Sequence, residues 1–131
     1  MPYLQLDVPS EYPAEQKKQL AARLGRTYAD LMKTTPRRVS VGIRELTGGS
    51  LWRCQEDEPV PGAVLMCDVR RGRPREWREN LAIALLDICS EELSLSRNNM
   101  AVEFTQHAGD EMFRPDEGWA KNWNENEAAP V

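Results

Sequence analysis

Residues 2–8 read PYLQLDV, and residues 63–69 read AVLMCDV. Apolar residues alternate with other residues in the first segment, which is the pattern of a half-buried β-strand. The two segments lie 61 positions apart, and further positions match at this offset: Pro13 and Pro74, Glu15 and Glu76, Leu20 and Leu81, Leu24 and Leu85, Val41 and Val102. The chain is therefore built from two copies of one unit.

Each copy reads as strand, turn, helix, loop and strand. In both copies we expect the helix to begin at a proline, Pro13 or Pro74, because proline suits the first helical position. Apolar residues then recur at helical spacing, at Leu20, Leu24, Tyr28 and Leu31 in the first copy and at Leu81, Leu85, Ile88 and Cys89 in the second. Apolar residues at 39–43 and 100–104 indicate the closing strands. Two strands joined through a helix predict a right-handed parallel β-α-β unit.

We expect one domain of the α+β (α/β) class, in which tandem β-α-β units form a four-stranded mixed sheet with two helices on one face. The units cover residues 2–46 and 63–107, with a linker at 47–62 and a C-terminal tail at 108–131. Turn residues at 47–50 predict a hairpin in the linker. Leu51 or Trp52 could wall a pocket or simply pack. The tail carries Trp119 and Trp123, for which we weigh packing on a neighbouring subunit against packing over the site.

Composition excludes several classes of function. The net charge of −4 argues against general nucleic-acid binding. No apolar run approaches the roughly 18 residues needed to span a bilayer, and no secretory signal is recognisable before the first strand, so we expect a cytoplasmic protein without a membrane partner. Three scattered cysteines are expected to be free thiols, and the single His107 argues against a metal site.

The proline at position 2 has chemical consequences. Aminopeptidases readily remove Met1 before proline, which would leave Pro2 with a free secondary amine. An α-amino group has a reference pKa of roughly 7.7–8.0, and burial lowers it towards neutrality because burial disfavours the cation. Such an amine can serve as a general base, a general acid or a nucleophile. The alternative is that Pro2 is only a processing signal.

An arginine-rich turn, Arg70-Arg71-Gly72-Arg73, follows the first strand of the second copy. If the two copies pair around a pseudo-two-fold axis, their first strands run antiparallel, and Pro2 comes to lie near Arg70 and Arg73. Fixed cations at a helix N-terminus favour an anion. The copies have diverged accordingly, since Ala63 stands at the position of Pro2 and Tyr12 at that of Arg73. We therefore expect one site per chain, although such a turn alone could be a solvated surface.

These features resemble the tautomerase superfamily, whose members carry a catalytic amino-terminal proline on a β-α-β unit. The first copy resembles 4-oxalocrotonate tautomerase, and the fused form resembles the cis-3-chloroacrylic acid dehalogenase group over roughly residues 2–115. The resemblance implies a tautomerase (MIF-like) fold, a homotrimer, a small carboxylate substrate and no cofactor. It also implies that Pro2 is catalytic and that Arg70 and Arg73 hold the substrate carboxylate.

The resemblance assigns three further positions, each with a departure from that group. Tyr28 replaces a histidine that assists substrate binding, while Glu103 and Arg114 stand where the group has a tyrosine and a glutamate that activate water. Glu103 could still orient water, whereas Arg114 cannot act as a base and is expected to be a third anion contact.

Three functions follow from these expectations. The favoured one is keto–enol tautomerisation of a 2-oxo acid with Pro2 as general base. The alternative is hydration, dehalogenation or decarboxylation of an unsaturated acid with Pro2 as general acid. In the third, the trimer binds an anion without catalysis.

Overall fold

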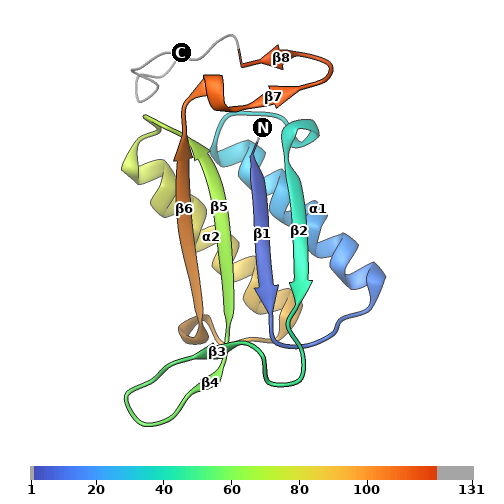
Figure 1. The fold of residues 1–131 in the computed structure, drawn as a ribbon, viewed down its shortest axis with the longest axis vertical. Coiled ribbons are helices and arrows are strands. Elements are labelled where there is room, and N and C mark those ends of the chain that lie inside the picture. Colours follow the sequence, from blue (N-terminus) through green and yellow to red (C-terminus); the bar gives the residue numbers. More distant parts are fainter. Residues whose placement is uncertain (1, 121–131) are drawn as a thin grey trace.

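The computed structural model describes residues 2–120 as a mixed sheet with two long helices on one face (Figure 1). The first unit consists of β1 (Tyr3–Val8), α1 (Ala14–Leu31), the 3-10 turn η1 (Pro36–Arg38) and β2 (Ser40–Glu45). The second consists of β5 (Ala63–Arg70), α2 (Arg75–Leu93), the 3-10 turn η2 (Arg97–Asn99) and β6 (Met100–His107). The fold is α+β, as predicted.

The strand order β2-β1-β5-β6 follows from the duplication. β1 pairs with β2, and β5 with β6, in parallel, while the two units meet through the antiparallel pair β1 and β5. Leu4 lies opposite Cys67 in this central pair. The start of β1 therefore lies beside the end of β5, which is the arrangement expected from a pseudo-two-fold axis.

The core lies between the sheet and the helices. Every second residue of the central strands is buried, at Leu4, Leu6 and Val8 of β1 and at Leu65, Cys67 and Val69 of β5. The helices cover these side chains with the buried residues Leu20, Leu24, Leu81, Leu85 and Cys89. Among the described residues, neither long helix is apolar enough to cross a membrane.

Both long helices begin one residue later than predicted. Pro13 and Pro74 have ψ angles of 147° and 143°, so each is the extended residue before the helix and not its first helical residue. Their carbonyls still accept the first hydrogen bonds, from Lys17 N (3.1 Å) and Arg78 N (3.3 Å). Proline fits here as well, because it has no N–H to satisfy.

The segments outside the repeat lie at opposite ends of the sheet (Figure 1). The linker forms the predicted hairpin from β3 (Trp52–Arg53) and β4 (Val60–Pro61), at the end where β1 finishes. After β6, the 3-10 turn η3 (Gly109–Glu111) leads to a second hairpin of β7 (Phe113–Arg114) and β8 (Gly118–Trp119), which lies across the end where β1 begins. The predicted residue Trp123 lies outside the described residues.

Candidate active site

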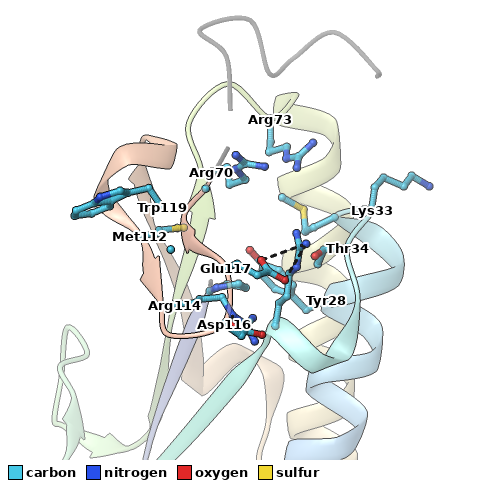
Figure 2. Close-up of a pocket in the computed structure, with 15 residues that line it drawn as sticks. Tyr28, Lys33, Thr34, Arg70, Arg73, Met112, Arg114, Asp116, Glu117 and Trp119 are labelled. Carbon is cyan, nitrogen blue, oxygen red and sulfur yellow. Dashed lines mark hydrogen bonds and ion pairs between the residues drawn. The ribbon is translucent and has the colours of Figure 1, made fainter. Parts of the chain in front are cut away.

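A pocket of about 470 Å³ opens at the end of the sheet where β1 begins and β5 finishes. Parallel pairing within each unit brings the end of α1 and the turn η1 to this same end, and the β7–β8 hairpin closes its other side (Figures 1 and 2). Five of the six residues expected from the sequence line the pocket, namely Pro2, Tyr28, Arg70, Arg73 and Arg114.

Pro2 is buried directly before the start of β1. Its carbonyl accepts a hydrogen bond from Ser40 N at 3.1 Å, which fixes the residue against the first position of β2. The antiparallel register of β1 and β5 then carries it to the end of β5. Pairing of the sheet backbone therefore places this proline in the pocket.

Arg70 is the last residue of β5, and Arg73 follows three residues later, two residues before α2 begins at Arg75. Between them Gly72 has φ +95°, a conformation that favours glycine and reverses the chain direction. The Arg73 guanidinium lies 5.6 Å from the centre of the Trp77 ring, and Lys33 Nζ lies 5.9 Å from the same centre. Trp77 therefore positions Arg73 through a cation–π contact. Trp77 lies four residues after Arg73, in the first turn of α2.

Tyr28 contributes a wall of the pocket. Its hydroxyl donates to the Asp68 carbonyl at 2.7 Å, and only 3% of the residue is exposed. Burial raises the pKa of Tyr28 well above its ordinary value, with the neighbouring Cys67 and Asp68 adding to the effect. The phenol stays neutral, and its proton is directed at the backbone of β5.

Glu103 does not line the pocket. It lies opposite Met66 in the β5–β6 ladder, whereas Arg70 lies opposite His107, four positions further along. The strand register therefore places Glu103 on the exposed face of the sheet, away from the helices and towards the middle of the strand. Leu51 and Trp52 also lie away from the pocket, in the region of the linker hairpin; Trp52 donates from Nε1 to the Gly49 carbonyl at 2.6 Å.

Arg114 reaches the pocket from β7, with 15% of its side chain exposed. Its Nε lies 3.2 Å from Asp116 Oδ1. Trp119 from β8 also lines the pocket and packs edge-on against Phe113, with ring centres 5.0 Å apart. Trp119 thus lies over the site within the chain, and 55% of the residue remains exposed.

Sequence reasoning missed several charged residues of the pocket: Lys33, Arg38, Asp116 and Glu117. Glu117 lies 3.5 Å from Arg38 Nη2 and 3.3 Å from Arg37 Nη2, which ties the β7–β8 turn to η1. A break in the repeat was the available signal for the arginines, since Arg37 and Arg38 correspond to Asn98 and Asn99 in the second unit. Asp116 and Glu117 come after the second unit ends, so the first unit has no corresponding positions with which they could be compared.

The lining is electrostatically unbalanced. Five cationic side chains face two carboxylates, and both carboxylates pair with arginines of the same pocket. Apolar surface from Met32, Met112 and Trp119 completes the wall. A positively charged pocket with apolar side chains in its wall favours an organic anion.

Comparison with known proteins identifies the fold. Pt0534, whose structure is that of the protein inactivated by 2-oxo-3-pentynoate, is 24% identical, with a TM-score of 0.78 over 91% of this chain and 96% of that chain. N1, a member of the cis-3-chloroacrylic acid dehalogenase family, is 17% identical, with a TM-score of 0.79 over 89% of this chain and 82% of its own. A fused 4-OT, solved as a symmetric trimer, is 17% identical, with a TM-score of 0.77 over 90% of this chain and 94% of its own.

These structural neighbours are tautomerase superfamily members, and the chain has their fold, as the resemblance predicted. No protein-family model matches the sequence. A comparison with curated proteins likewise finds no match.

Proposed function

We propose that the protein is a cofactor-independent tautomerase that interconverts the enol and keto forms of a 2-oxo acid, with Pro2 as the general base after removal of Met1. The observation that carries the proposal is the convergence of a buried Pro2 with Arg70 and Arg73 in one pocket. Each feature alone has an ordinary structural explanation, but a proline that would carry an amine beside two cations suits an acidic substrate.

In this mechanism the neutral amine of Pro2 takes a proton from the enol hydroxyl and returns it to carbon. Burial and the neighbouring arginines favour the neutral amine at neutral pH, because both disfavour its cation. Arg70 and Arg73 bind the carboxylate and stabilise the charge that develops on the enolate oxygen. Tyr28 supplies a neutral wall, and Arg114 supplies a further cation on the opposite side of the pocket.

The proposal includes a homotrimer, the assembly named for the fused 4-OT neighbour. In the single chain, β2 and β6 are edge strands, and the sheet face opposite the helices exposes Tyr3 and Met66. Assembly would cover strand edges that otherwise favour uncontrolled pairing.

Hydration or dehalogenation of an unsaturated acid is the second candidate, favoured by the similarity to N1 of the cis-3-chloroacrylic acid dehalogenase family. That chemistry needs an oriented water as well as a protonated Pro2. Glu103 lies outside the pocket, so a carboxylate of the β7–β8 turn, Asp116 or Glu117, would have to orient the water. Both carboxylates are paired with arginines, which places this reaction second.

The pH dependence of kcat/KM separates the two reactions. With a stable enol of a 2-oxo acid, activity should rise as pH increases through the pKa of the Pro2 amine, because the base must be neutral. With a 3-haloacrylate, activity should fall over the same range, because the acid must be protonated. Saturable anion binding without turnover of either compound would support the third possibility, a non-catalytic anion-binding protein.

A further inference from the structure

We propose that Arg38 and Arg114 form a second anion subsite in the pocket and that Glu117 is an internal competitor for it, so that the pocket selects ligands with two anionic groups. A dicarboxylate would place one carboxylate at Arg70 and Arg73. Its other carboxylate would displace Glu117 from the second subsite. The subsite at Arg70 and Arg73 rests on the proposed function. The subsite at Arg38 and Arg114 rests on contacts at the other side of the pocket.

The cations of the pocket form two separate sets. Figure 2 shows Arg70 and Arg73 together at one end and Arg114 with Asp116 and Glu117 towards the other. Arg38, which reaches the pocket from η1, pairs with Glu117 and therefore belongs to the second set. One small carboxylate cannot occupy both sets, whereas a pocket of about 470 Å³ has room for a longer ligand.

The second set has hydrogen-bond donors without acceptors. Arg38 Nε and Arg114 Nη1 are buried, and neither has a hydrogen-bond acceptor within residues 2–120. A buried charged donor without an acceptor is costly, because it has lost water and gained nothing in exchange. A ligand oxyanion could supply acceptors for both groups.

Glu117 holds its arginines only loosely. Its oxygens lie 3.3 Å from Arg37 Nη2 and 3.5 Å from Arg38 Nη2, beyond the roughly 2.7–2.9 Å of a strong charge-assisted hydrogen bond. The same fold makes such bonds elsewhere, since Arg44 binds Asp7 through contacts of 2.7 and 2.9 Å. The side chains of Glu117 and Arg38 are each about one-third exposed, so water weakens their ion pair further.

Glu117 can leave its position without disturbing the core. It lies in the turn between β7 and β8, directly before Gly118, which has φ +70°. The Phe113–Trp119 contact holds the two short strands together independently of this side chain. A change of rotamer at Glu117 would therefore expose the second set while the hairpin stays closed.

The test compares two ligands that differ by one carboxylate, 2-oxoglutarate and 2-oxopentanoate, by calorimetric titration of the full-length protein. Glu117→Gln should tighten binding of 2-oxoglutarate about tenfold and leave 2-oxopentanoate unchanged, because only the dicarboxylate competes with Glu117. Arg38→Ala and Arg114→Ala should each weaken 2-oxoglutarate about tenfold or more and should weaken 2-oxopentanoate much less, because only the dicarboxylate contacts both sets. Glu58→Gln, a change of equal charge in the exposed linker hairpin, is the control and should alter neither affinity.

Equal effects of Glu117→Gln on both ligands, or none on either, would overturn the proposal, as would equal losses for both ligands in the Arg38 and Arg114 variants. Each of the four variants should melt close to the temperature of the unchanged protein, so that a loss of affinity reflects the site and not the fold. Arg73→Ala should weaken both ligands, because it removes the shared end of the site. Selective binding of 2-oxoglutarate without turnover of any enol would contradict the proposed tautomerase and leave the second subsite standing.

Discussion

Pro2 and Arg73 each have a counterpart in the other unit that lacks their chemistry, Ala63 and Tyr12. Ala63 is buried at the start of β5 and carries no terminal amine. Tyr12 donates from its hydroxyl to the Leu93 carbonyl at 3.2 Å, which ties the loop before α1 to the end of α2. At this repeated position Tyr12 ties the loop before α1 to the end of α2, whereas Arg73 lines the pocket and lies over the Trp77 ring.

Replacing Arg70 or Arg73 with alanine should lower kcat/KM for an acidic substrate by ten- to a hundredfold. Loss of a charged hydrogen-bond partner costs about 1.5–3 kcal/mol in transition-state binding, which corresponds to this range. Steady-state kinetics and a melting curve for each variant check the prediction.

Arg71→Ala and Arg75→Ala are the matched controls. Arg71 is exposed and lies 3.9 Å from Glu111, and Arg75 is exposed at the start of α2; neither lines the pocket. Similar losses at all four positions would mean that the turn acts as a general electrostatic surface.

The thiols should differ sharply in reactivity. Burial raises the pKa of Cys67, with Asp68 adding to the effect, and burial alone raises that of Cys89; both values reach about 12, so almost no thiolate forms near pH 8. Cys54 is exposed in the linker. Iodoacetamide should therefore modify Cys54 alone in the native protein and all three cysteines in urea, as peptide mapping would show. Rapid native modification of Cys67 would contradict the packing of β5 against the helices.

At the level of elements, the repeat alone predicts most of the fold. Two copies of a strand–helix–strand pattern dictate parallel pairing within each unit, and the antiparallel centre follows from the pseudo-two-fold axis. These features determine which strand ends meet, and so they predict that Pro2, Arg70 and Arg73 share one end of the sheet.

The remainder of the site was beyond prediction because it depends on geometry that the repeat does not encode. Glu103 lies outside the pocket because it is in the middle of β6. The pairing of β6 with β5 sets this position. Asp116 and Glu117 come from a hairpin of two-residue strands, too short for a recognisable alternating pattern. The turn of this hairpin meets η1 through Glu117, a contact between segments about 80 residues apart that only the folded chain brings together.

The contact between α1 and the end of β2 should make stability depend on pH. Glu45 accepts from Lys17 Nζ (2.8 Å) and Tyr12 N (2.6 Å), and these bonds hold the pKa of Glu45 below its ordinary value. A depressed native pKa adds stability above the unfolded pKa of roughly 4.3, and this stability is lost as pH falls through the native value. Glu45→Gln should therefore melt at a lower temperature than the unchanged protein at pH 7, with the gap closing towards pH 3. A constant gap across this range would contradict the assignment.

At the level of the whole molecule, the sheet has one face covered by helices and one face open in the single chain (Figure 1). Along the open face run the exposed residues Tyr3, Met66 and Glu103. Asp68 on the same face accepts hydrogen bonds from Thr105 Oγ1 and from Tyr3 N, which connects β5 to both neighbouring strands. A sheet with one unburied face and two edge strands is a surface that assembly would cover.

Sedimentation equilibrium at micromolar concentration should give a mass three times that of the 14.9 kDa chain. Glu103 lies on the open face that such an assembly would cover. A stable monomer under these conditions would contradict the trimer.

The central claim is that Pro2 is a free, neutral and confined amine, and intact-mass analysis with an acetylenic acid tests it most directly. The purified protein should lack the mass of Met1 and should gain a single adduct with 3-bromopropiolate near pH 7, located at Pro2 by peptide mapping. Arg73→Ala should slow this labelling, because the arginine holds the carboxylate of the reagent beside the amine. Retention of Met1, or labelling that falls on lysines or on Cys54 and spares Pro2, would contradict the account.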